Sequence, residues 1–405
     1  MLERLTSYPR YSMDVTPAEM ARAFREVASG HAVTGDEQQR FADAFAAFCR
    51  VRHALPVSSG RYALSLILNA LGVREGDEVI LPAYNYYVVP EMMRQLGVTP
   101  VLAGPDAGSR NMTVESTEKR VTPRTRGILV THMLGNPCPM DGFLDLARRK
   151  RLFLVEDCAH AAGATIHGKP AGSFGDAALF SLSVQKTPTA MGGGVAVTND
   201  SGLMDAMTRE CAERLPGVRE TLSALAFGAA CVAASNPAVF TASAFPVMAV
   251  GDRLGLKIDE LFLLDSPQRP KKRGAVPGLL SNAQCALGLS QLGRMEAIVA
   301  ARRAHAASYA RLLSDCPGLT LPGETPGLTH TWLYYMALCD SRDHVAARLL
   351  AVGVDCEGRD FVDCSAADTY LEARSLRLPN SSALSGADVA CIAGRVRSVC
   401  TRRSG

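Results

Sequence analysis

The chain has 405 residues, of which 47% are hydrophobic and 20% charged, a composition typical of a globular protein with a sizeable core. A formal net charge of +3, without a basic patch interleaved with aromatic residues, does not favour nucleic-acid binding. The twelve cysteines are scattered without a Cys-x-x-Cys pair, which favours reduced thiols over a metal site or a disulfide framework. The polar N-terminal residues do not form a signal peptide, so we expect a cytoplasmic protein.

Two amphipathic helices are predicted near the N-terminus, within residues 16–50. Thr16 is suited to be the N-cap of the first, with Pro17 at the first helical position and Gly30 at the end. Residues 1–15, which precede this helix, are expected to form an extended arm.

Strands and helices then alternate along the chain. The strands are rich in Val, Ile and Leu, which favours a mostly parallel sheet between helices and hence an α/β fold. They are predicted at residues 53–58, 78–81, 98–102, 127–131, 152–155, 177–182 and 194–198.

A carboxylate and a lysine follow two of these strands. Glu156 and Asp157 come directly after strand 152–155, and Lys186 follows strand 177–182 in a segment without helical periodicity. Ligands of open α/β sheets bind at the carboxyl ends of the strands. An acid and a lysine delivered there, about 29 residues apart, suit pyridoxal phosphate (PLP), with the lysine as Schiff base and the acid on the pyridine nitrogen.

A phosphate cradle is a further candidate feature. Ser59-Gly60-Arg61 is a short turn between strand 53–58 and the helix that ends at Gly72. The backbone N–H groups and the dipole of a helix N-terminus attract phosphate. The tripeptide alone is equally compatible with an ordinary turn.

Several motifs together make the chain similar to the DegT/DnrJ/EryC1/StrS family. They are Glu156-Asp157-Cys158-Ala159-His160-Ala161, Gly175-Asp176, Phe180-Ser181, Lys186 and Gly192-Gly193-Gly194. The resemblance covers about residues 41–198 and resumes from about 281. It implies a fold-type I PLP-dependent transferase, with a mostly parallel sheet flanked by helices and a smaller C-terminal α/β domain. We place the large PLP-binding domain at 1–293 and the small domain at 294–405.

The resemblance also implies roles for individual residues. Lys186 would form the Schiff base, and Asp157 would hold the pyridine nitrogen. Tyr86 would stack on the cofactor ring and His160 would lie beside it. The phosphate would be held by Ser59, Gly60, Arg61 and Ser181. From the residues alone, Tyr86 could instead pack at an interface, and Asp157 could cap a turn.

The chain departs from the family pattern at four positions. Arg61 stands where the family has Thr, and Gly192 stands where it usually has Glu. Pro277 and Leu279 replace an Asn and an Arg, of which the Asn commonly reaches the PLP phosphate of the neighbouring subunit. These departures could weaken PLP binding or activity.

The activity implied by the resemblance is transamination. An amino group would pass from glutamate or glutamine to a nucleotide-linked keto sugar or a cyclitol-type acceptor, in polysaccharide or antibiotic biosynthesis, with the enzyme as a homodimer. A PLP-dependent sugar dehydratase is an alternative, although such family members typically have His in place of the lysine. A non-catalytic or weakly active partner protein is the other alternative.

An apolar insertion at about residues 216–276 has no counterpart in the family. Residues 221–251 carry no charge, but Asn236-Pro237 and Pro246 interrupt them. We expect two short helices there, packed on the body or covering a dimer partner, and membrane-surface contact stays an alternative. The C-terminal part is predicted to contain a long helix at 282–313, a strand at 330–338 and helices at 342–352 and 383–400.

Overall fold

A computed structural model of the chain describes residues 6–11, 13–211, 214–254, 276–356, 361–365 and 369–401. The second part of the insertion predicted at about 216–276, from residue 255 to residue 275, lies outside the described residues.

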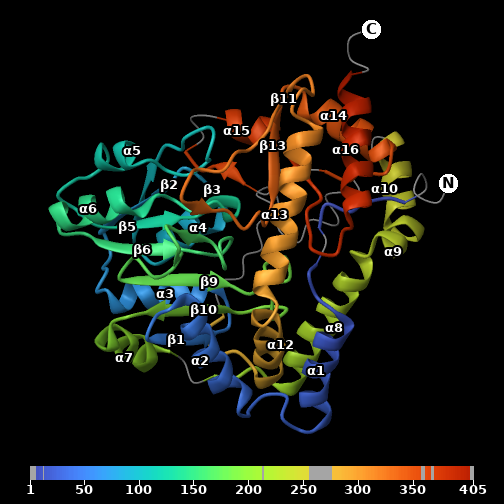
Figure 1. Cartoon of the computed structure of the whole chain (residues 1–405). Coiled ribbons are helices and arrows are strands. Elements are labelled where there is room, and N and C mark those ends of the chain that lie inside the picture. Colours follow the sequence, from blue (N-terminus) through green and yellow to red (C-terminus); the bar gives the residue numbers. More distant parts are fainter. Residues whose placement is uncertain are drawn as a thin grey trace.

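A seven-stranded sheet forms the larger part of the molecule, in the order β1–β10–β9–β6–β5–β2–β4 (Figure 1). Neighbouring strands are parallel from β9 to β4, whereas β10 is antiparallel to both β9 and β1. The predicted mostly parallel sheet is therefore confirmed. Its strands are β1 (His53–Val57), β2 (Glu78–Pro82), β4 (Thr99–Ala103), β5 (Thr125–Thr131), β6 (Phe153–Asp157), β9 (Ala177–Ser181) and β10 (Gly194–Thr198).

Helices cover both faces of this sheet, because successive strand residues point to opposite sides. In β6, for example, Leu154 belongs to the core on one face and Val155 to the core on the other. The first face is covered by α2 (Glu37–Cys49), α6 (Met140–Lys150) and α12 (Asn282–Leu292). The second is covered by α3 (Gly60–Ala70), α4 (Val88–Gln95) and α7 (Ser201–Glu210).

The C-terminal part has a separate core around a small antiparallel sheet. This sheet consists of β11 (Leu319–Thr320), β13 (Tyr335–Cys339) and β15 (Ser375–Leu378). The helices of this part are α13 (Met295–Leu312), α14 (Arg342–Ala351), α15 (Tyr370–Arg374) and α16 (Gly386–Thr401). Shorter elements are α5 (Val114–Glu118), η2 (Met133–Gly135), β3 (Tyr84–Asn85), β7 (Thr165–Ile166), β8 (Lys169–Pro170), β12 (Leu328–Thr329) and β14 (Val362–Asp363).

Two predicted elements of the C-terminal part are wrong in extent. The helix predicted at 282–313 is divided into α12 and α13, because α12 ends with Gly293 as its C-cap. The strand predicted at 330–338 begins only at Tyr335. Before it, Thr331 and Tyr334 donate their backbone N–H groups to the carbonyls of Gly135 and Leu134, and so hold this segment against the large sheet's loops.

The uncharged stretch forms three helices rather than the predicted two: α8 (Val218–Ala234), α9 (Pro237–Ala242) and α10 (Ala244–Arg253). Asn236 caps α9 by accepting the N–H groups of Ala238 and Val239. Pro246 lies in the first turn of α10, where its missing N–H would have no intrahelical acceptor. These helices extend along one side of the molecule, from α1 (Pro17–Ala28) towards the C-terminal helices (Figure 1). Within the described ranges, no helix is both long enough and apolar enough to cross a membrane.

The described residues of the N-terminal arm, 6–11 and 13–15, form no helix, which agrees with the predicted extended arm, and they connect these regions. Ser7 donates its N–H to Thr241 Oγ1 in α9, at 2.7 Å. Tyr8 pairs with the segment after α14, through hydrogen bonds to the backbone of Gly353 and Asp355. Thr16 then caps α1, as its sequence predicts.

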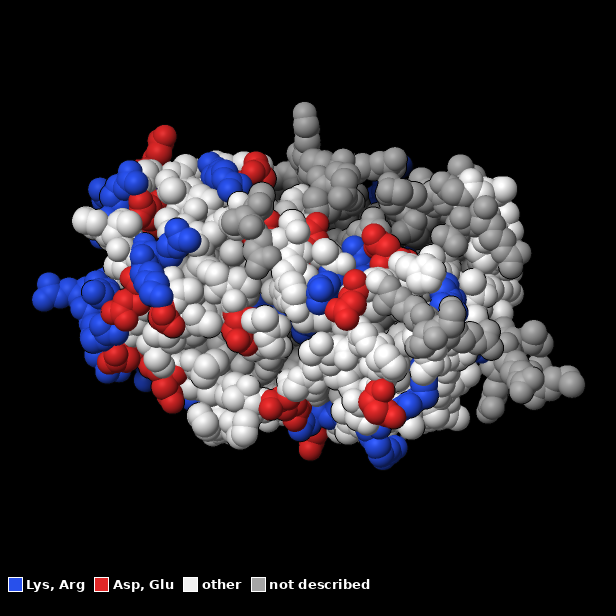
Figure 2. Space-filling model, turned by 90° about the horizontal axis from the view of Figure 1, so that it is seen from above, with Lys and Arg blue, Asp and Glu red and all other residues white. Residues whose placement is uncertain are grey.

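Charged side chains of both signs lie among one another on the face of the molecule shown in Figure 2. Among the described residues on that face, we see no broad region of a single sign.

Candidate active site

The carboxyl ends of the parallel strands meet at one edge of the sheet, beside a cavity of about 480 Å³. Asp157 and Ser181 are the last residues of β6 and β9, and Ser59 follows the end of β1. All eight residues predicted for the site line this one cavity: Ser59, Gly60, Arg61, Tyr86, Asp157, His160, Ser181 and Lys186. The sheet topology therefore brings together residues that are up to 127 positions apart in the sequence.

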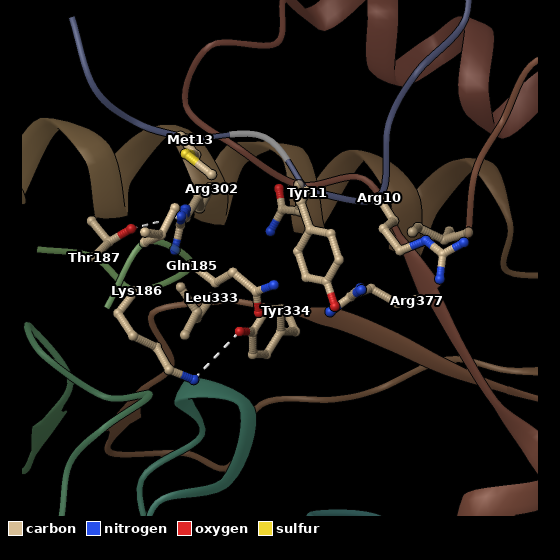
Figure 3. A pocket seen from close by; sticks show the side chains of 13 residues that line it. Arg10, Tyr11, Met13, Gln185, Lys186, Thr187, Arg302, Leu333, Tyr334 and Arg377 are labelled. Atoms are coloured by element: carbon tan, nitrogen blue, oxygen red, sulfur yellow. Dashed lines mark hydrogen bonds between the residues drawn. The ribbon is translucent and has the colours of Figure 1, made fainter. Parts of the chain in front are cut away.

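Lys186 lies in the connection between β9 and β10, where its N–H donates to the carbonyl of Ser183 at 2.9 Å. Its side chain is half-buried, and Nζ lies 3.5 Å from the Tyr334 hydroxyl and 5.5 Å from the centroid of that ring (Figure 3). An aromatic side chain from the C-terminal part thus positions the amine at the cavity.

Asp157 is buried, and its Oδ1 accepts the N–H of Ala159 at 3.0 Å. Burial raises the pKa of Asp157, and the hydrogen bond from Ala159 and the positive charge of Lys186 oppose this rise. The carboxylate therefore both caps a turn and faces the cavity, so the two roles considered for it are compatible.

His160 is buried between two aromatic side chains, edge-on to Tyr334 and Phe361 with ring centroids 5.6 and 5.1 Å away. Its Nδ1 accepts the backbone N–H of Leu134 at 3.3 Å, which assigns the ring proton to Nε2. Burial and then the charge of Lys186 lower the pKa of His160 well below its ordinary value. The imidazole is therefore neutral at pH 7.

The start of α3 forms a cradle against the end of β9. Ser59 caps the helix by accepting the N–H of Tyr62 at 3.1 Å. A Cβ on Gly60 would lie 3.3 Å from the Cβ of Ser181, and one on Gly194 would lie 2.4 Å from the nitrogen of Gly60. Glycines thus allow the helix N-terminus, β9 and β10 to approach closely, which leaves first-turn N–H groups beside the Ser181 hydroxyl.

The three tyrosines after β2 have different environments. Tyr84 is buried and contacts Phe361 with ring centroids 6.2 Å apart. Tyr86 lines the cavity. The Tyr87 ring lies edge-on to the Tyr86 ring, with the two ring centroids 5.2 Å apart. The sequence alone does not distinguish these three side chains.

Two polar neighbours of the site have structural roles. Glu156 accepts the N–H groups of Gly172, Phe174 and Gly175 at 2.7–2.9 Å and so holds that loop. His132 accepts the N–H of Cys138 at Nδ1 and donates from Nε2 to Glu156 at 3.1 Å. The imidazole of His132, the carboxylate of Glu156 and the sulfur of Cys158 lie close enough together to hold a metal ion. However, His132 and Glu156 are already engaged in the hydrogen bonds described above.

Some lining residues could not be found from the sequence. Tyr11 comes from the arm, Phe227 from α8, and Tyr334 and Phe361 from the C-terminal part. Gly192 also lines the cavity and has φ +137°, a backbone conformation that a Glu at this position would adopt only with strain.

The segment that carries Pro277 and Leu279 runs beside the end of β1 in its own chain. Leu279 forms a bridge with Val57, and the N–H of Ser58 donates to the carbonyl of Gly278 at 2.9 Å. It therefore lies next to the cradle at the start of α3.

The profile of the DegT/DnrJ/EryC1/StrS aminotransferase family matches residues 15–223 and 268–392. The chain belongs to this family. Residues 224–267, which include Phe227 of the cavity wall, lie outside the matched parts of this family member.

Individual relatives agree with this membership. The erythromycin biosynthesis sensory transduction protein EryC1 of Saccharopolyspora erythraea is 31% identical over 331 residues, which cover 82% of this chain and 77% of that protein. GDP-perosamine synthase of Escherichia coli O157:H7 is 40% identical over 171 residues, 42% of this chain and 47% of its own length. The chain thus spans about half the length of this second relative.

The crystal structure of S. venezuelae DesV in complex with a ketimine intermediate superposes with a TM-score of 0.72 at 26% identity, covering 94% of each chain. This similarity confirms the predicted fold class.

Proposed function

We propose that this protein is a PLP-dependent aminotransferase. It would move an amino group from glutamate or glutamine to a nucleotide-linked keto sugar or a cyclitol-type acceptor. The observation that carries the proposal is the meeting of Lys186, Asp157 and the start of α3 at one cavity. The relatives' names and the family membership support the same reaction class.

The cavity's donor set fits the cofactor. The aldehyde of PLP needs an amine, its pyridine nitrogen needs a carboxylate, and its phosphate needs N–H and hydroxyl donors. Lys186, Asp157 and the cradle with Ser181 offer these three kinds of group. Tyr86 adds an aromatic face and His160 a neutral imidazole. When bound, the cofactor supplies an electron sink that makes the Cα proton of a linked amino acid acidic.

The chain's own residues would then do the following work. Lys186 would hold the cofactor and, once the donor displaces it, take the proton from the donor's Cα through Nζ. Asp157 would keep the pyridine nitrogen protonated, helped by the charge of Lys186, which favours its ionised form. Ser59, Gly60, Arg61 and Ser181 would hold the phosphate. Lys186 would perform the reverse proton transfer with the acceptor.

We also propose the assembly that the family resemblance implies. The enzyme would be a homodimer of chains with a large domain at 1–293 and a small domain at 294–405. The hydrophobic core of the C-terminal part, which is separate from the cores on the two faces of the large sheet, supports this division.

A partner protein without efficient turnover is the second candidate. Gly192, Pro277 and Leu279 replace polar family residues beside the cavity or the cradle, and this observation favours it. The presence of Lys186 argues against a dehydratase.

Replacing Lys186 tests the proposal. The purified chain with PLP should show an absorbance band of a lysine-linked cofactor, and borohydride should trap the cofactor on Lys186. Lys186→Ala should lose both the trapping and the turnover of glutamate, because none of the other described residues that line the cavity is a lysine. Lys169→Ala, at an exposed lysine that lies over Phe174, is the matched control and should keep both. The absence of any spectral change with PLP in the unmodified chain would favour the partner protein.

Asp157→Asn should separate cofactor attachment from proton removal. The amide keeps the size of the side chain but does not hold the pyridine nitrogen protonated. Borohydride trapping on Lys186 should persist, whereas the half-reaction with glutamate should slow on the order of 100-fold. Stopped-flow absorbance with glutamate measures this rate. An unchanged rate would exclude contact between Asp157 and the cofactor nitrogen.

A further inference from the structure

Phe227 differs from the other aromatic residues of the cavity wall. It comes from α8 and lies outside the parts of the chain that the family profile matches. Phe227 is 50% exposed, whereas Tyr334 and Phe361 are buried and contact each other and His160. Within the described part of the chain, no other aromatic ring or cation packs on the Phe227 ring. The ring therefore offers an uncovered apolar face at the cavity.

The packing of α8 fixes where this ring lies. Gly228, the next residue of the helix, approaches Met191 so closely that an added Cβ would lie 2.2 Å from the Met191 sulfur. The loop that begins at Met191 continues to Gly193, which lines the cavity and forms a bridge with Ser59 of the cradle. This glycine loop thus connects α8 to the cradle, and Phe227 stands at the exposed rim of the cavity.

The free space beside Lys186 is unequal on its two sides. A second cavity of about 20 Å³ adjoins on the side of Tyr11 and Arg377, and it accommodates little more than one water molecule (Figure 3). The large cavity of about 480 Å³ also begins at Lys186, and its wall includes Phe227. A substrate that reacts at Lys186 and is larger than an amino acid must therefore occupy the large cavity.

The charge of the large cavity suits a substrate that carries phosphates. Asp157 is the only acidic side chain among its described lining residues, and it is buried. Two cations, Lys186 and Arg61, line the same cavity. Gly192, in the loop on which α8 packs, adds no side chain and no charge. No described carboxylate at the rim would thus repel a diphosphate.

We propose that Phe227 is a specificity-determining residue that stacks on the flat nucleobase of the acceptor. The inference rests on the aminotransferase function, and of the two acceptor classes it selects the nucleotide-linked keto sugar. Glutamate and a cyclitol are compact and strongly hydrated, so neither gains much from an uncovered phenyl ring. A base has a flat apolar face that matches such a ring, and every base can stack in this way.

The affinities for nucleoside diphosphates and for inorganic pyrophosphate test this role. Isothermal titration would use the full chain, with and without PLP, and the diphosphates of uridine, thymidine and guanosine. At least one of them should bind more tightly than pyrophosphate, which has no base. Phe227→Ala should weaken the binding of that nucleotide on the order of tenfold and leave the affinity for pyrophosphate unchanged.

Two further variants separate stacking from simple apolar contact. Phe227→Tyr keeps the flat ring and should bind the nucleotide nearly as tightly as the unmodified chain. Phe227→Leu stays apolar but has no flat face, so it should lose most of the gain over pyrophosphate. In steady-state kinetics, Phe227→Ala should raise the KM for the nucleotide-linked keto acceptor. The KM for glutamate and the borohydride trapping on Lys186 should not change.

Leu222→Ala is the matched control. Leu222 is also an exposed apolar residue of α8, but it lines neither cavity. Its replacement should leave the nucleotide affinity and both KM values unchanged. Circular dichroism checks the fold of each variant, and an exposed position such as Phe227 tolerates truncation better than a core position does.

Three results would overturn the assignment. Equal nucleotide affinity in the unmodified chain and in Phe227→Ala, or nucleotide affinity no greater than that for pyrophosphate, would remove the stacking contact. A weaker affinity for PLP in Phe227→Ala would assign the ring to the cofactor. Failure of the aminotransferase function is a separate outcome, because it appears as missing turnover and missing borohydride trapping, whereas nucleotide binding needs neither.

Discussion

Neighbouring side chains with the same chemistry have opposite roles at the end of β6. Glu156 and Asp157 are consecutive carboxylates, and strand geometry directs them to opposite faces. The Glu156 side chain points into the protein and accepts backbone N–H groups of the 172–175 loop. The Asp157 side chain faces the cavity. The sequence predicts this alternation but not which carboxylate meets the ligand, so the choice of Asp157 depended on the family resemblance.

Glu156→Gln should destabilise the fold. Burial would raise the pKa of Glu156, but the hydrogen bond and charge of His132, with the N–H groups of Gly175 and Gly172, hold it below its ordinary value. An amide would direct an NH₂ group at one of these donors. The free energy of unfolding should fall by about 2–4 kcal/mol.

Urea unfolding measures this loss. Glu118→Gln is the control, since Glu118 is exposed and pairs with the half-exposed Arg149, and it should change the free energy of unfolding by less than about 1 kcal/mol. Equal losses in both variants would mean that Glu156 does not hold the loop.

At the scale of elements, α8 shows what a composition-based prediction can and cannot give. Its uncharged sequence and the positions of the prolines predict helices with breaks. The side of the helix that packs inward is not evident from the sequence, because apolar residues of α8 lie on all of its faces. In the structure Thr221, Leu225 and Gly228 face the body, and Leu222 and Phe227 are exposed. Gly228 contacts Met191, which precedes the cavity residue Gly192.

Gly228→Ala should therefore be destabilising relative to an open helical site. Its Cβ would lie 2.2 Å from the sulfur of Met191, so the loop before Gly192 would have to shift. A Cβ on Gly394 of α16 would meet nothing within 4 Å, and Gly394→Ala should gain about 0.5–1 kcal/mol. The two variants should differ by about 1–3 kcal/mol in urea unfolding. Equal effects would show that α8 is loosely docked.

At the scale of the whole molecule, local patterns predicted the strands and the meeting of the site residues at one edge. They did not predict the contributions of Tyr11, Tyr334 and Arg377. These residues reach the site through contacts between segments that are hundreds of positions apart, which no periodicity encodes. After His330 and Thr331, the run to residue 338 is apolar or aromatic throughout, so the residues before Tyr335 could not be separated from the strand.

Two buried histidines predict how stability depends on pH. Burial, with the charge of Lys186, lowers the pKa of His160 well below its ordinary value, and burial with the charge of Arg303 does the same for His330. The unfolded chain takes up protons near pH 6.5 and the folded chain does not, so stability falls as the pH drops below that value. The slope should reach about 1.4 kcal/mol per pH unit for each histidine.

Unfolding curves between pH 7.5 and 5 check this slope. His160→Asn and His330→Asn should each lower the slope of the unfolding free energy against pH by about 1.4 kcal/mol per pH unit. A slope that is unchanged in both variants would contradict the burial of neutral imidazoles.

The extended arm has a practical consequence. Ser7 is bonded to α9, Tyr8 to the segment after α14, Tyr11 lines both cavities, and Asp14 pairs with Arg302. A truncated protein that starts at α1 would keep the large sheet but would lose the side chain of Tyr11 from the wall of the large cavity. Purification tags and crystallisation truncations therefore belong at the opposite terminus.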